Sequence, residues 1–122
     1  MKIFTIALLA GVSLGAHAAL AQQPTPAGNI ENGKKHFRSD GCYQCHGTVG
    51  NGAAISGPRL SNTGLPFEAF LMQLRQPSNE MPPYEAKIIS DATVADIYAY
   101  MKSLPPSPDP KNLPLLTGMG VK

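Results

Sequence analysis

Residues Gly41 to Gly47 read G-C-Y-Q-C-H-G, and this stretch holds both cysteines of the 122-residue chain. Two residues separate Cys42 from Cys45, and His46 follows the second cysteine directly. A disulfide across so short a loop would restrict very little of the unfolded chain, so stabilisation is a weak reason for the pair. The spacing therefore indicates a chemical role for the thiols and the imidazole.

The N-terminal residues 1–21 have the pattern of a secretory signal peptide. Lys2 supplies a positive charge, an apolar run follows it, and the small residues of A-H-A and A-L-A come next. We expect cleavage after Ala21, or after Ala18, and export of the mature protein to the periplasm. An uncleaved membrane anchor is the alternative, but the apolar run is short for a span, and no other segment is apolar enough to cross a bilayer.

Composition indicates one globular domain with a nearly neutral surface. Hydrophobic residues make up 43% of the chain, and its formal net charge of +2 falls further when Lys2 leaves with the signal peptide. A chain of this length forms at most one ordinary domain. Nucleic-acid-binding proteins carry a concentrated basic surface, so we expect no nucleic acid as a partner.

Three helical patterns, separated by turn-rich segments, predict an all-α fold. We expect the first over residues 30–38 after an Asn29 cap, the second over 66–75 with Pro66 as its first residue, and the third over 91–104 after a Ser90 cap. No alternating β pattern is present. The prediction is three main helices joined by long loops.

The remaining segments are a linker, a loop and a tail. Residues 22–28 form a Pro/Ala-rich linker, and residues 47–64 form a long polar loop of the kind that wraps a ligand. In the tail, residues 105–122, the prolines exclude a regular helix or a central strand. Its leucines either fold back over the domain or dock on a partner, and we favour docking.

The pattern C-x-x-C-H is the attachment signature of c-type haem. In an exported chain, Cys42 and Cys45 can add to the two haem vinyl groups, and His46 can then reach the iron. A zinc site would need two further ligands, and His36 lies before the motif in a different helix. A thioredoxin-like redox pair needs a βαβ context that this chain lacks. We therefore predict one covalent haem c, with a redox disulfide or a metal site as the alternatives.

A methionine is expected to supply the sixth iron ligand. The part of the chain after the signal peptide contains four, namely Met72, Met81, Met101 and Met119. Met81 differs from the others because it lies in N-E-M-P-P-Y, where Pro82 and Pro83 restrict the backbone before any ligand binds. We predict His46 and Met81 as the axial pair; the alternative is that Met81 fills a gap beside a turn.

At this point the chain resembles the small monohaem class I cytochromes c of bacteria. The motifs that carry the resemblance are G-C-Y-Q-C-H-G, G-P-R-L at Gly57–Leu60, M-P-P-Y at Met81–Tyr84 and S-D-A-T-V-A-D-I-Y-A-Y-M-K-S-L at Ser90–Leu104. The resemblance implies a cytochrome c domain over residues 29–104, in which the first and last helices cross beside one haem. At that crossing Gly33 and Phe37 would meet Tyr98 or its neighbours.

The resemblance also implies further site residues. The Pro58 carbonyl should accept the ring N–H of His46, a contact that fixes ligand orientation. Arg59 is a candidate partner of a haem propionate, with an ordinary solvated arginine as the alternative. Tyr84 would contact a propionate or cover the haem.

Two protein ligands on the iron predict a one-electron carrier and not an enzyme, because no position remains for a substrate. We favour an electron acceptor or cytochrome subunit of a periplasmic dehydrogenase. The alternatives are a freely diffusing carrier to a terminal oxidase and a haem enzyme, such as a peroxidase, with an open sixth position.

Overall fold

The computed structural model describes residues 25–118, so the predicted signal peptide lies outside the described residues. The elements in chain order are α1 (Ile30–Ser39), α2 (Cys42–His46), α3 (Phe67–Arg75), α4 (Asp91–Ser103), the 3-10 helix η1 (Pro110–Asn112) and α5 (Pro114–Thr117). Within the described range there is no strand, only an isolated bridge between Ala53 and Gly57. The predicted all-α cytochrome c fold is confirmed. None of the described helices has the length and apolar character that a membrane span needs.

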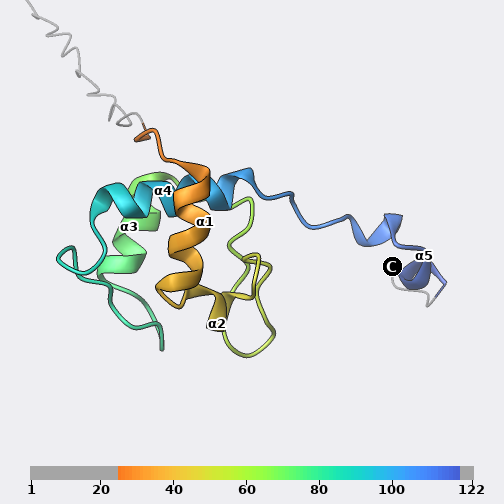
Figure 1. Ribbon diagram of the computed structural model, residues 1–122. Helices are drawn as coiled ribbons and strands as arrows, with labels where there is room; N and C mark the ends of the chain where they lie inside the picture. Colours follow the sequence, from red (N-terminus) through yellow and green to blue (C-terminus); the bar gives the residue numbers. More distant parts are fainter. Residues whose placement is uncertain (1–24, 119–122) are drawn as a thin grey trace, which may run out of the picture.

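Helices α1 and α4 cross at close range, and Figure 1 shows α1 passing in front of α4. Gly33 makes the approach possible, because a Cβ at this position would overlap the Asp96 carbonyl group and lie 2.9 Å from the Cβ of Tyr100. Phe37, which is fully buried, packs its ring edgewise against Tyr100 at a centroid distance of 5.8 Å. At the crossing, α1 therefore contacts Tyr100, whereas Tyr98 faces α3.

The chain already packs against α4 before α1 begins. A Cβ at Gly28 would overlap the Ala95 carbonyl, and the Asn29 amide donates to the Asp96 carboxylate at 2.6 Å. The Asn29 side chain in turn accepts from the Asn32 amide, as a helix cap does. Gly28, which we had placed in the linker, is thus part of the packed domain.

Helix α3 covers another side of α4. Its Phe67 and Phe70 rings contact the Tyr98 ring edgewise at 5.6 and 5.3 Å, and the Tyr98 hydroxyl donates to the Leu65 carbonyl at 2.7 Å. Pro66 precedes α3 as its cap and is not its first helical residue, because its ψ of 155° is extended. Ser90 caps α4 as predicted and accepts from the Thr93 amide.

The prediction that the tail holds no regular helix is wrong, because η1 and α5 both lie in it. Pro114 is the first residue of α5, where a helix needs no donor from its backbone nitrogen, so proline is compatible with a helix start. Arg59 donates to the Pro105 carbonyl at 2.9 Å and fixes the start of the tail. Beyond this point the tail leads away from α1–α4 (Figure 1), and Leu115 is 85% exposed.

Candidate functional site

The C-x-x-C-H residues form a helix of their own, α2, which lies between two glycines in unusual conformations. Gly41 has φ 84° and Gly47 has φ 78°, values that side-chain-bearing residues rarely adopt. These glycines let the chain turn sharply at both ends of a single helical turn. Residues three apart on a helix share a side, so α2 presents Cys42 and Cys45 together.

Both cysteine side chains are free thiols. Cys45 is exposed, while Cys42 is partly buried against the core. Burial raises the pKa of the Cys42 thiol to about 11, and the nearby Asp40 carboxylate adds to this effect. The Cys42 thiol is therefore protonated at neutral pH.

His46 is buried and has a defined orientation. Its exposed fraction is 8%, and its Nδ1 lies 2.8 Å from the Pro58 carbonyl oxygen. With Nδ1–H donating to that carbonyl, Nε2 carries the lone pair that binds a metal. The loop containing G-P-R-L thus fixes the tautomer and the ring direction of His46.

Two residues that the sequence reasoning did not single out bring this loop against α2. Gly57 lies so close that a Cβ would stand 3.0 Å from His46 Nδ1 and 2.9 Å from the Cys45 carbonyl oxygen. Ser56 donates from its hydroxyl to the same carbonyl at 2.8 Å. In the sequence, the Gly57-Pro58 pair could have indicated a close approach of this loop. Nothing near Ser56 in the sequence indicates that its hydroxyl bonds the Cys45 carbonyl.

Tyr84 brings the M-P-P-Y segment to the end of α1, just before α2. Its hydroxyl lies 3.5 Å from the Asp40 carbonyl oxygen. Burial raises the pKa of Tyr84, and the charges of Cys42, Cys45 and Asp40 raise it further.

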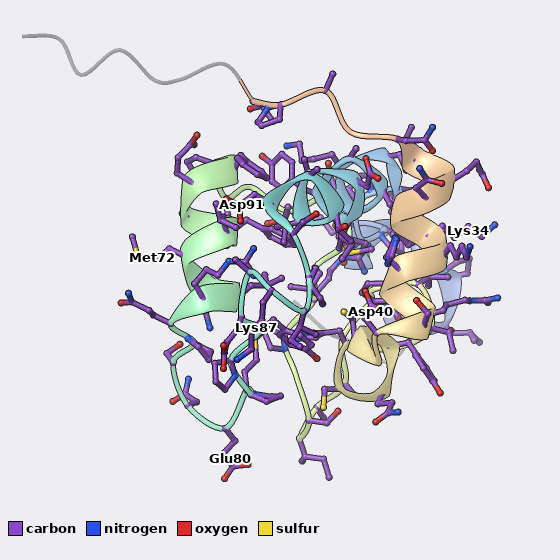
Figure 2. The ribbon with its side chains drawn as sticks, turned by 60° about the vertical axis from the view of Figure 1, so that its left-hand side comes forward. Lys34, Asp40, Met72, Glu80, Lys87 and Asp91 are labelled. Atoms are coloured by element: carbon purple, nitrogen blue, oxygen red, sulfur yellow. The ribbon has the colours of Figure 1, made fainter. Side chains whose placement is uncertain are left out.

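The methionines occupy different surroundings. Met72 is 59% exposed on α3 and points away from the rest of the molecule (Figure 2), whereas Met101 is fully buried in α4. Met119 lies outside the described residues. Met81 is partly buried in the segment between α3 and α4, which also carries Tyr84.

Met81 belongs to a set of partly buried side chains that we call the apolar rim. The rim consists of residues that pack against the buried core and keep part of their surface open, namely Cys42, Leu60, Leu71, Met81, Tyr84 and Leu104. They come from α2, the 47–64 loop, α3, the segment 76–90 and the end of α4. These five parts of the chain therefore each leave some apolar surface partly open beside the core.

Arg59, in contrast, is directed to the tail through its bond to the Pro105 carbonyl. Another arginine is more closely tied to the segment that carries Met81. Arg75, the last residue of α3, donates to the carbonyls of Tyr84 and Ile89 and pairs with the Asp91 carboxylate. A basic residue in a last helical turn is common, so the sequence offered no signal for these distant partners.

This fold, with its C-x-x-C-H helix, its oriented histidine and its apolar rim, defines a small c-type cytochrome. Residues 28–101 match the family model described as cytochrome c oxidase, cbb3-type, subunit III. The chain is also 34% identical over 96 residues to cytochrome c-555 of Methylococcus capsulatus (strain Bath), an alignment that covers 77% of each protein. The chain belongs to the cytochrome c family, as a small monohaem class I member. No solved structure gives a significant match.

Family membership identifies the chain as a haem-based electron-transfer protein. The family implies haem c as the cofactor, and both cysteines of the attachment signature are present.

Proposed function

We propose that the protein carries one haem c, bound covalently through Cys42 and Cys45, and transfers single electrons in the periplasm. His46 and Met81 serve as the axial ligands. The observation that carries the proposal is the orientation of His46, which follows the second thiol in α2 and keeps Nε2 for a metal because Nδ1 lies on the Pro58 carbonyl.

The residues present fit this cofactor. Two free thiols on one helical turn can form two thioether bonds, and an imidazole and a thioether are ligands of electron-carrying haems. The apolar rim offers a surface that a flat macrocycle would cover. Arg59 and Tyr84 remain candidates for contact with the propionates.

Haem iron, when bound, supplies the one-electron ferric/ferrous couple. Cys42 and Cys45 would hold this group, the Pro58 carbonyl would keep the His46 ring oriented toward it, and the apolar rim with the core behind it would exclude water. Because Met81 is a neutral thioether, it favours the ferrous state and raises the potential. No proton needs to move at His46, since its Nδ1–H remains on the Pro58 carbonyl.

For the redox partner, we propose a periplasmic dehydrogenase that the protein serves as electron acceptor or cytochrome subunit. The exposed Leu115 in a tail that leads away from the domain supports a dedicated partner. A terminal oxidase is the second candidate, favoured by the name of the matching family model.

Mass spectrometry of the protein from the periplasmic fraction tests the cofactor. We expect the mass of the cleaved chain plus one haem, and a haem that stays with the protein during acid–organic extraction. Replacing Cys42 and Cys45 with alanine should release the haem in that extraction. A wild-type mass equal to that of the bare chain would contradict the proposal.

A further inference from the structure

The segment between α3 and α4, residues 76–90, carries Met81 and is held by one partly buried cation. Arg75 Nη1 donates to the Tyr84 carbonyl at 2.5 Å, and Nη2 donates to the Ile89 carbonyl at 2.8 Å and to the Asp91 carboxylate. The Arg75 side chain is only 19% exposed. It therefore joins the end of α3, two points of the segment and the first turn of α4.

The backbone of Tyr84 is fixed on both sides. Its amide donates to the Leu74 carbonyl at 2.8 Å, and its carbonyl accepts from Arg75, so consecutive residues of α3 hold both polar groups. Pro82 and Pro83 are the residues between Met81 and Tyr84, and proline fixes φ near −65°. A fixed Tyr84 therefore restricts where the Met81 backbone can lie.

The other end of the segment has weaker attachments. Beyond the Gln76 amide, which donates to the Met72 carbonyl, the side chains of Gln73 and Ser78 share an exposed hydrogen bond of 3.2 Å. Glu80 is exposed and projects from the outer turn of the segment (Figure 2). Exposed hydrogen bonds contribute less than charge-assisted ones, so Arg75 is the principal constraint on the segment.

We propose that Arg75 is a positioning residue for Met81 and keeps its sulfur in place as an iron ligand. This inference rests on the His46/Met81 ligation proposed above. When Arg75 is lost, the sulfur should leave the iron more often, and an added ligand should compete more easily for the sixth position. The apparent affinity for that ligand rises in proportion to the fraction of molecules in which the sulfur has left.

The test is a titration of the ferric holoprotein with imidazole, followed by the weak near-infrared iron–sulfur absorption. In Arg75→Gln we expect imidazole to bind about tenfold more tightly than in the wild type, the effect of losing one such constraint. Lys102→Gln is the matched control, because Lys102 donates to the Thr63 carbonyl in the other loop at 3.0 Å. Asp91→Asn removes the ion pair and leaves both carbonyl bonds of Arg75. Both controls should stay close to the wild-type affinity.

A purely structural role of Arg75 would lower the melting temperature of Arg75→Gln and leave its imidazole affinity at the wild-type value, and this result would overturn the inference alone. If that variant yields no holoprotein, Arg75→Lys decides. A lysine ammonium lacks the planar fork with which the guanidinium holds both carbonyls. We therefore expect Arg75→Lys to bind imidazole with an affinity between those of the wild type and Arg75→Gln. A wild-type imidazole affinity in Arg75→Lys would again overturn the inference. A wild-type protein without iron–sulfur absorption would refute the proposed ligation and this inference together.

Discussion

Gly33→Ala tests whether the contact between α1 and α4 sets the stability of the protein. In an isolated helix this substitution would be favourable by about 1 kcal/mol, because alanine is the better helix former. Here the added Cβ would overlap the Asp96 carbonyl group and lie 2.9 Å from Tyr100 Cβ. Backbone atoms cannot rotate away, so the helices must separate, and overpacking of this kind costs typically about 1–3 kcal/mol or more.

Because the overlap is with backbone, we take the upper end of this range, about 3 kcal/mol, and expect a net loss of about 2 kcal/mol after the gain in helix propensity. Such a loss lowers the melting temperature of a domain of this size by roughly 10 °C. The assay is thermal unfolding of the holoprotein by far-ultraviolet circular dichroism. Gly64→Ala is the control, because a Cβ at Gly64 would have no atom within 4 Å. A Gly33→Ala protein that melts at or above the wild-type temperature would refute the close-packing argument.

Two further predictions concern the sixth ligand and the tail. Met81→Ala should abolish the near-infrared iron–sulfur absorption, lower the potential and let carbon monoxide bind the ferrous protein, because the thioether is gone. Met72→Ala, at an exposed position of α3, is its control, and retention of all three wild-type properties in Met81→Ala would exclude Met81. Truncation after Pro106 keeps the Arg59 bond to Pro105, so we expect an unchanged melting temperature and visible spectrum with weaker binding to the redox partner in a pull-down. A large loss of stability with binding intact would show that the tail packs on the domain.

The sequence predicted the elements that depend on local signals. Asn29 and Ser90 cap their helices as expected, since a cap is read from a few neighbouring residues. Helix α1 extends to Ser39, one residue beyond the prediction, and α4 ends at Ser103, one residue before it. The C-x-x-C-H motif was equally accessible, because its chemistry follows from spacing within five residues.

Features that depend on distant parts of the chain could not be read in this way. Phe37 contacts Tyr100 and not Tyr98 because of the angle at which α1 and α4 cross. The residue pattern of a single helix carries no information about that angle. Arg75 has partners up to 16 residues away, and only the folded segment brings two carbonyls and the Asp91 carboxylate to one guanidinium. The prediction for the tail fails for a different reason: proline disrupts the interior of a helix, but Pro114 stands at the start of one.

The two proposed ligands are held by different means, and this difference bears on electron transfer. His46 is fixed by backbone contacts of α2 and the loop beside it, where Pro58 accepts its ring N–H and Gly57 permits the approach. Met81 lies in a segment whose Tyr84 and Ile89 carbonyls accept from the Arg75 side chain. An electron carrier works best when its ligands keep the same positions in both oxidation states, because movement of a ligand adds to the barrier. The histidine side meets this condition mainly through backbone contacts, so the methionine side is where a change of a single residue should alter the redox behaviour most.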